Sequence, residues 1–315
     1  MAQKQAAMPK QAVNFDITPE KRASQLSFFK RQLFRKTEPV TRDEVDLAGQ
    51  TAIVTGSNTG LGLECSRQLL DIGLSKLIIA VRNEAKGEAA KKQLLVDRSA
   101  DQVIEVWKID FSDYDSVTQF VERTKTLDRL DIVVHNAGVS NLKLHLNPKT
   151  GYEESVQINY LSSVLFIILL LPVMKGKNSP ERPGRLSLVS SETAAWAPFK
   201  ERNSDPLLGA FKKEEDFVGM ERYWLSKLLG QFFLAELVKR VPSSVAIVNA
   251  PNPGLCYGTS LVDEYNSTVV GFIFGIVTRV IGRSSSLGAR AFTDAAVRHG
   301  EKSHGHYMED GKVQP

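Results

Sequence analysis

Seven strand-like runs alternate with longer helix-forming segments from Asp46 to the end of the chain, and this alternation narrows the fold to one class. Strands that alternate with helices form a mostly parallel sheet, with right-handed crossovers that place helices on both faces. We therefore expect an α/β protein with a Rossmann-like, doubly wound, mostly parallel seven-stranded sheet in a single domain, residues 46–315. The runs are TAIVT (51–55), KLIIAV (76–81), VIEVWKI (103–109), LDIVVH (130–135), RLSLVS (185–190), SVAIVNA (244–250) and the short HGHYM (304–308).

The charge of the chain is unevenly distributed. Residues 1–36 hold eight Lys or Arg and two acids, a balance of +6, so the total of +4 leaves −2 for the remainder. A basic tail on a near-neutral body is not the profile of a nucleic-acid-binding domain, and we expect no nucleic-acid partner. The chain contains only two cysteines, Cys65 and Cys256. This speaks against a disulfide framework and predicts a reducing, cytoplasmic location.

Two segments bear on membrane contact. The most apolar run, VLFIILLLPV (164–173), is shorter than eighteen residues, so we expect a buried helix rather than an ordinary transmembrane helix. In the N-terminal extension, residues 1–45, Leu26, Phe29 and Leu33 recur at helical spacing among basic residues, which predicts a short basic amphipathic helix. This helix either docks on its own domain or makes a peripheral contact with a membrane surface.

The run TGSNTGLG, residues 55–62, follows the first strand and opens a helix. Gly56, Gly60 and Gly62 allow a tight turn and a close approach of the backbone to a pyrophosphate at the helix N-terminus. Ser57, Asn58 and Leu61 complete this loop, which predicts a dinucleotide-binding site.

The end of the second strand predicts which dinucleotide is bound. NAD-binding folds place an acid about twenty residues beyond the glycine loop, where it binds the ribose hydroxyls. Twenty residues beyond Gly62 this chain has Arg82, in the run AVRNE, and no acid at positions 80–82. An arginine suits a 2′-phosphate, so we expect NADP(H) rather than NAD(H).

Tyr223 and Lys227, in YWLSK, are one helical turn apart and point from the same face of a helix. A phenol titrates near pH 10 and is a poor base at neutral pH. An ammonium about 5 Å away stabilises the phenolate by roughly 3 kcal/mol at an effective dielectric constant of about 20. The pair therefore predicts a tyrosine general acid/base with a lowered pKa.

These features, taken in order, resemble the short-chain dehydrogenase/reductase family, single-domain type. The resemblance extends to retinol-dehydrogenase-like, WW-domain-oxidoreductase-like and related fungal enzymes, which carry extra sequence between the serine and the tyrosine. The matching runs are TGSNTGLG, Asp110 in KIDFS, Asn136-Ala137-Gly138, Asn159 in QINYL, Ser191 in LVSSETA, Tyr223 and Lys227 in YWLSK, and NPG at 252–254.

The resemblance implies four catalytic residues. Tyr223 would be the general acid/base, and Lys227 would lower its pKa and hold the nicotinamide ribose. Ser191 would bind the substrate carbonyl, with Ser190 as the alternative, since only one of two successive strand residues can face the cleft. Asn159 would position a water that links Lys227 to solvent.

The resemblance also implies cofactor contacts beyond the glycine loop. Asp110 would contact the adenine, while Asn136 and Gly138 would line the cofactor cleft. Pro253 and Thr259 would meet the cofactor after the sixth strand, although Thr259 lies one residue later than in the family pattern. No metal site is expected, because the five histidines have no cysteine or carboxylate cluster beside them.

Two segments, residues about 192–222 and 255–285, are expected to form the substrate loop and lid. The very apolar run Val269–Val277 either lines a pocket for a hydrophobic substrate, dips into a membrane surface, or forms a core helix or subunit contact. A homodimer through the helices bearing Asn159 and Tyr223 is a further expectation from the family.

The functional expectation is an NADP(H)-dependent oxidoreductase that interconverts a carbonyl and an alcohol. Its substrate would be a hydrophobic small molecule: retinoid-, steroid-, lipid- or polyketide-like. The alternative is a catalytically silent dinucleotide-binding protein that serves as a redox sensor or scaffold. Because the Asn, Ser, Tyr and Lys positions are all filled, the enzyme is favoured.

Overall fold

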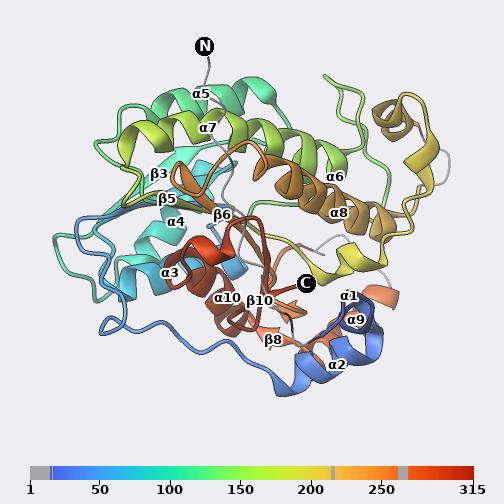
Figure 1. Cartoon of the computed structure of the whole chain (residues 1–315), viewed down its shortest axis with the longest axis horizontal. Helices are drawn as coiled ribbons and strands as arrows, with labels where there is room; N and C mark the ends of the chain where they lie inside the picture. Colours follow the sequence, from blue (N-terminus) through green and yellow to red (C-terminus); the bar gives the residue numbers. More distant parts are fainter. Residues whose placement is uncertain (1–14, 16, 214–216, 262–268) are drawn as a thin grey trace, which may run out of the picture.

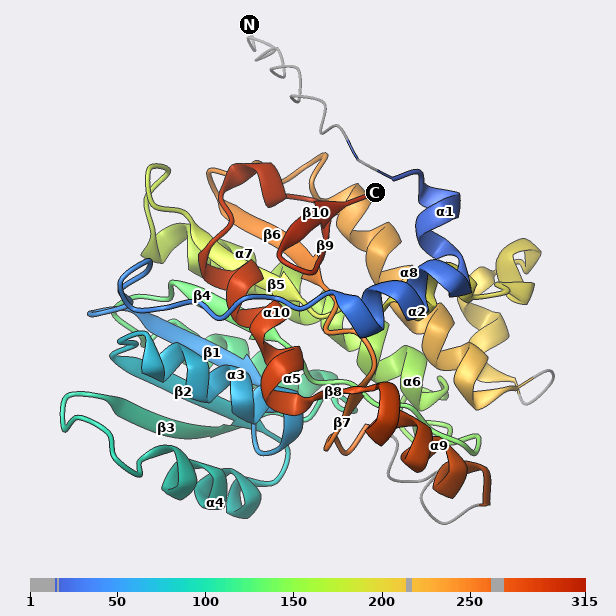
Figure 2. The ribbon, with the colours of Figure 1, turned by 90° about the horizontal axis from the view of Figure 1, so that it is seen from below.

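One sheet forms the centre of the protein, with helices on both faces (Figures 1 and 2). The computed structural model describes residues 15, 17–213, 217–261 and 269–315. The strand order is β10-β9-β6-β5-β4-β1-β2-β3, and all neighbours except β9 and β10 are parallel. The strands are β1 (Thr51–Thr55), β2 (Lys76–Val81), β3 (Val103–Lys108), β4 (Ile132–His135), β5 (Gly184–Leu188), β6 (Ala246–Pro251), β9 (Tyr307–Glu309) and β10 (Lys312–Gln314).

The predicted fold class is confirmed, but the prediction of seven strands is wrong because the sheet has eight. After β9 the chain turns back through Asp310 and Gly311, whose φ angles are +52° and +72°. These left-handed values belong to a two-residue hairpin turn, for which Asp-Gly is a preferred sequence. The hairpin adds β10 antiparallel to β9, and the Asp-Gly pair was the signal that could have predicted it.

Two hydrophobic cores lie on the two faces of the sheet. One contains side chains from α3, α4 and α10, and the other contains side chains from α5, α7 and α8. Figure 1 shows these two groups of helices on opposite sides of the strands. The helices are α1 (Pro19–Ala23), α2 (Gln25–Phe34), α3 (Gly60–Asp71), α4 (Glu84–Leu94), α5 (Tyr114–Thr124), α6 (Glu154–Val156), α7 (Ser163–Lys177), α8 (Gly219–Leu237), α9 (Val269–Ile281) and α10 (Ser285–Val297).

The expectation that no helix has the length and composition of a membrane span is not met. Within the described ranges one continuous helix, Glu154–Lys177, is long and apolar enough, with a mean hydropathy of 2.0 over its most apolar window. In this structure 61% of that window is buried inside the protein. Phe166, Ile167 and Leu170 are fully buried in the core. In this structure the helix therefore belongs to the core, which agrees with the prediction of a buried helix at 164–173.

The N-terminal helix docks on its own domain, but not through the predicted face. Leu26, Phe29 and Leu33 are exposed, whereas Phe28 and Gln32, on an adjacent face of α2, are buried. The apolar spacing identified a helix, yet polar contacts of Gln32 and aromatic packing of Phe28 decide which side is buried. The apolar face of α2 is exposed, and its contact with a membrane stays a prediction.

The predicted substrate segments take different forms. Residues 192–212 form three short 3₁₀ turns, η2 (Glu192–Trp196), η3 (Lys200–Asn203) and η4 (Leu207–Lys212). Phe211 is fully buried and packs with Leu225 of α8 in a third hydrophobic cluster. The second segment contains α9, closed at its base by the short pair β7 (Cys256–Tyr257) and β8 (Arg283–Ser284).

The apolar run predicted at 269–277 forms most of α9. The side chains of residues 269–274 and the whole of 262–268 lie outside the described residues. Ile276 and Val277 are exposed, at 49% and 42%. A role for this run in a pocket, a membrane or a subunit contact stays a prediction.

Candidate active site

The glycine loop is built as a backbone cradle at the start of α3. Gly56 and Gly60 have φ of +64° and +57°, in the left-handed region that favours glycine. A Cβ at Gly62 would lie 2.5 Å from the Gly56 carbonyl oxygen, so only glycine fits there. The Ser57 hydroxyl turns inward and donates to the Val54 carbonyl oxygen at 2.7 Å. Ser57 can therefore contact a phosphate only through its backbone.

Asn136 supports this loop from the end of β4. Its Nδ2 donates to the carbonyl oxygens of Thr55 and Gly56 at 3.0 and 3.1 Å. The Thr55 hydroxyl in turn accepts from the Ala137 amide at 2.9 Å and contacts His135 Nδ1 at 3.0 Å. Burial lowers the pKa of His135 to about 3, so this histidine is neutral and structural, not a base.

The two residues predicted to select and hold the adenosine half follow neighbouring strands. Arg82 is exposed at the end of β2 and makes no ion pair within the described part of the chain. The Asp110 carboxylate follows β3 and accepts from the backbone amide and hydroxyl of Ser112 at 2.9 and 2.7 Å. Both residues lie at the carboxyl edge of the parallel strands, where doubly wound folds bind ligands.

The segment after β6 returns to the glycine loop. A Cβ at Gly60 would lie 3.3 Å from the Cα of Thr259, which places Thr259 beside the loop despite its displaced position in the sequence. Pro253 lies in the turn before β7, and its carbonyl oxygen accepts from Arg283 at 3.2 Å. Gly138 is next to two of the predicted catalytic residues, because a Cβ there would lie 3.1 Å from Asn159 Oδ1 and 3.7 Å from Lys227 Nζ.

Ser191, Tyr223 and Lys227 are brought together where β5 ends and α8 passes. The Ser191 side chain lies near the Tyr223 hydroxyl and acts to lower the pKa of that phenol. Lys227 Nζ donates to the Val189 carbonyl oxygen at 2.9 Å and lies 5.8 Å from the centre of the Tyr223 ring. The helical spacing of YWLSK therefore places the ammonium beside the phenol, as the sequence predicts.

Ser190 faces away from this group. Its hydroxyl accepts from Gln231 Nε2 at 2.9 Å, whereas the Ser191 hydroxyl contacts Thr193 Oγ1 at 2.9 Å and accepts from the Thr193 amide. The preference for Ser191 over Ser190 thus agrees with the geometry.

Asn159 lies in a π turn, Gln157–Ser162, within the long helix. Such turns interrupt the regular hydrogen-bond ladder and occur often at functional sites. Asn159 Oδ1 accepts from the Val139 amide, and Nδ2 donates to the Val139 carbonyl oxygen and to Ser226 Oγ, all at 2.8 to 2.9 Å. Asn159 therefore joins the loop after β4 to α8, one residue before Lys227.

The prediction that Lys227 lowers the pKa of Tyr223 is wrong for the protein by itself. Burial raises the pKa of Tyr223 to about 12, and the nearby Ser191 side chain acts only partly against this. Burial also lowers the pKa of Lys227 to about 8. Removing the phenol and the amine from water disfavours their charged forms, and this effect is larger here than the attraction between the two groups.

The buried Lys227 makes a pH-dependent contribution to stability. Its pKa is 10.5 in the unfolded chain and about 8 in the folded protein, so the unfolded state binds more protons between these values. The free energy of unfolding of the wild type, relative to Lys227→Met, should therefore rise by up to about 3 kcal/mol as the pH rises from 8 to 10.5. Urea unfolding of both proteins measures this difference, with the exposed Lys30→Met as control. A difference that stays constant across this window would contradict the burial of the amine.

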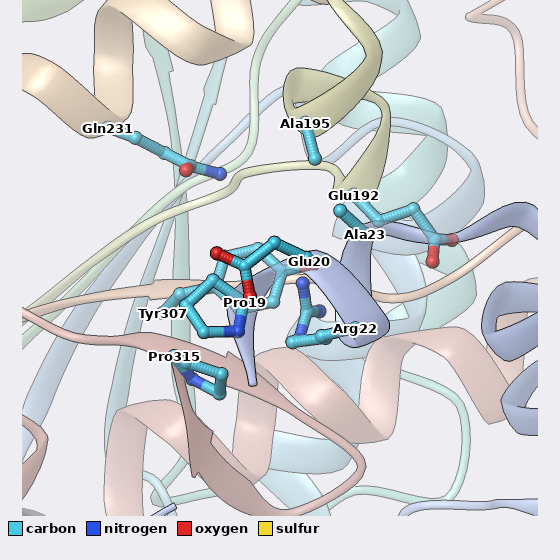
Figure 3. A pocket seen from close by; sticks show the side chains of 9 residues that line it. All are labelled: Pro19, Glu20, Arg22, Ala23, Glu192, Ala195, Gln231, Tyr307 and Pro315. Carbon is cyan, nitrogen blue, oxygen red and sulfur yellow. The ribbon is translucent and has the colours of Figure 1, made fainter. Parts of the chain in front are cut away.

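A cavity of about 310 Å³ lies between α1, η2, α8 and the C-terminal strands (Figure 3). None of the four predicted catalytic residues lines it, although Glu192 directly follows Ser191. We therefore do not assign it as the site of hydride transfer. Its lining residues are Pro19, Glu20, Arg22, Ala23, Glu192, Ala195, Gln231, Tyr307 and Pro315.

Several residues around the site were not predicted from the sequence. Arg31 of α2 is ion-paired with Glu192 at 3.2 Å and with Glu309 at 3.0 Å. Trp196 donates from Nε1 to the Ala23 carbonyl oxygen at 2.7 Å. No local pattern links the N-terminal extension to the turn after Ser191, because these contacts join positions more than 160 residues apart.

Known proteins resemble this chain in sequence and in fold. A family model described as short chain dehydrogenase matches residues 50–200. Short-chain dehydrogenase fogG of Aspergillus ruber is 50% identical over 309 residues, 96% of this chain and 88% of that protein. Short chain dehydrogenase/reductase mfmJ of Annulohypoxylon moriforme is 42% identical over 290 residues, 91% of this chain and 83% of that protein.

Solved structures show the same fold. A 3-oxoacyl (acyl-carrier-protein) reductase of Agrobacterium tumefaciens, crystallised with NADP bound, has a TM-score of 0.65 and 19% identity over 85% of this chain and 95% of that one. The fold and site define an oxidoreductase of the Rossmann type. The chain belongs to the short-chain dehydrogenase family. The likeness to fungal members is confirmed, and that to retinol dehydrogenases stays a prediction.

Proposed function

We propose that the protein is an NADPH-dependent reductase that converts a carbonyl group of a hydrophobic small molecule into an alcohol. The same enzyme would catalyse the reverse oxidation of the alcohol with NADP. The observation that carries the proposal is the gathering of Ser191, Tyr223 and Lys227 where β5 ends and α8 passes, with Lys227 Nζ 5.8 Å from the centre of the Tyr223 ring and bonded to the Val189 carbonyl oxygen. Two hydroxyl donors converge there beside a buried amine. This is the arrangement needed where negative charge develops on a carbonyl oxygen.

Each residue of the candidate site would have its own role in this reaction. The chemistry that NADPH would supply when bound is hydride donation to the carbonyl carbon. Ser191 donates a hydrogen bond to the carbonyl oxygen, and Tyr223 gives that oxygen its hydroxyl proton, so that an alcohol and a tyrosinate result. Lys227 stabilises the tyrosinate until a proton returns from solvent through the Asn159 region.

Residues of the glycine cradle fit a dinucleotide by geometry. The cradle admits no side chain at Gly62, and the exposed Arg82 has no competing ion pair among the described residues. Gly56, Asn58, Gly60 and Leu61 would hold the pyrophosphate, and Arg82 would bind the 2′-phosphate through charge-assisted hydrogen bonds.

Arg82→Asp should reverse the cofactor preference. A carboxylate repels the 2′-phosphate of NADPH and accepts hydrogen bonds from the ribose hydroxyls of NADH. We expect the ratio of kcat/KM for NADPH to that for NADH to fall at least 100-fold and to drop below one. Initial rates with each cofactor measure it, with the neighbouring exposed Lys86→Asp as control. An unchanged ratio would show that Arg82 does not contact the phosphate.

The proposal as a whole is tested by NADPH oxidation against a panel of hydrophobic ketones and aldehydes. The expected result is turnover of at least one member. The alternative, a silent dinucleotide-binding protein, predicts tight NADPH binding without turnover of any member.

A further inference from the structure

Gln32, in the middle of α2, is a buried polar side chain with all three of its hydrogen bonds on the segment 255–285. Its Oε1 accepts from the Leu255 amide at 3.0 Å. Its Nε2 donates to the carbonyl oxygens of Leu255 at 2.9 Å and Ile281 at 3.0 Å. Leu255 begins this segment and Ile281 ends α9, so one side chain holds both ends of the intervening chain. Only 5% of Gln32 is exposed.

The chain passes so close to Gln32 that a glycine is required beside it. Gly254 has a φ of +75°, and a Cβ there would lie 2.7 Å from Gln32 Oε1. Gly254 precedes Leu255, and Cys256 follows it. Cys256 is near enough to Tyr223 to affect the pKa of that phenol. The chain that Gln32 holds then continues to the glycine loop, because a Cβ at Gly60 would lie 3.3 Å from the Cα of Thr259.

A second, separate link fixes the turn before this segment. Arg283 Nη1 donates to the Pro253 carbonyl oxygen at 3.2 Å, and Nη2 donates to the Arg35 carbonyl oxygen at 2.9 Å. Nη2 also pairs with the Asp310 carboxylate at 2.9 Å. Pro253 thus keeps its place independently of Gln32, and a change at Gln32 should affect the segment after it more than the turn predicted to meet the cofactor.

We propose that Gln32 is a positioning residue for substrate binding. Through this residue the N-terminal helix α2 contributes to the active site. Gln32 holds Leu255 and Ile281 together, and so fixes residues 255–261, which reach the glycine loop at Thr259, relative to the end of α9. The inference rests on the proposed function, because substrate is what the segment would cover. It explains why a polar residue is buried on α2 while three apolar residues face solvent.

The test is Gln32→Glu, which keeps the acceptor for the Leu255 amide, removes both donors and adds a charge facing two carbonyl oxygens. We expect KM for a carbonyl substrate to rise at least 10-fold, with kcat and the Kd for NADPH within about 3-fold of wild type. As the pH falls from 8 to 6, protonation of the new carboxyl restores one donor, so the KM ratio to wild type should shrink. Gln25→Glu, exposed on the same helix, is the matched control and should change none of these values.

A second readout does not depend on turnover. Trypsin cleavage after the exposed Arg279 of α9, followed by mass spectrometry, should be at least 10-fold faster in Gln32→Glu and in the uncharged Gln32→Met than in wild type. Cleavage at the wild-type rate in both variants, or a lowered Tm with unchanged KM, would overturn the proposal. If the wild type reduces no carbonyl, the proposed function fails, while the cleavage rates still decide whether Gln32 holds the segment.

Discussion

Tyr223→Phe is expected to lower kcat at least 100-fold and to leave the Kd for NADPH within about 3-fold of wild type. The substitution removes one hydroxyl, which is the proton donor in reduction, and keeps the ring that packs in the site. General acid catalysis of this kind contributes about 10²- to 10⁴-fold to a rate. Because the loss should appear in kcat and kcat/KM alike, it would report an interaction made in the transition state.

The matched control for this substitution is Tyr160→Phe. Tyr160 is also a partly buried tyrosine whose pKa is raised by burial, but it packs in the third hydrophobic cluster. It should keep nearly full activity. A Tyr223→Phe protein with wild-type turnover would exclude the tyrosine mechanism, and a Tyr160→Phe protein as impaired as Tyr223→Phe would point to a packing effect.

Ser191→Ala should lower kcat about 100-fold, which is the scale found when one donor to a developing oxyanion is removed. Ser190→Ala should change kcat by no more than a few-fold, although it deletes the 2.9 Å hydrogen bond from Gln231 and costs about 1 kcal/mol of stability. Steady-state kinetics and urea unfolding of the two variants separate the roles. Equal kcat losses, or a larger loss in Ser190→Ala, would reverse the assignment.

Local patterns were sufficient to predict most of the fold. The apolar runs at 51–55 and 76–81 coincide with β1 and β2, because a strand buried on both faces requires continuous apolar sequence. The Asp310-Gly311 hairpin carried a local signal as well, although it was not used in the prediction.

Relations between distant residues could not be predicted in the same way. The buried face of α2 depends on backbone groups at Leu255 and Ile281, and no spacing within residues 25–34 shows them. The pKa of Tyr223 depends on how far the site is removed from water, which a helical spacing does not report. The sequence thus predicted which residues the fold brings together at the candidate site, and their catalytic roles stay predictions, while their electrostatic environment and their contacts with the N-terminal helix required the structure.

The central claim is that Tyr223 provides the proton for hydride transfer to a carbonyl carbon. The most direct measurement uses NADPH carrying deuterium at C4, in each of its two stereochemical forms, with a hydrophobic ketone or aldehyde that the wild type reduces. The account predicts deuterium on the carbinol carbon of the alcohol with one form of the cofactor, formed at least 100-fold more slowly by Tyr223→Phe. Label transfer at the wild-type rate by Tyr223→Phe, or no label in any product of the wild type, would contradict it.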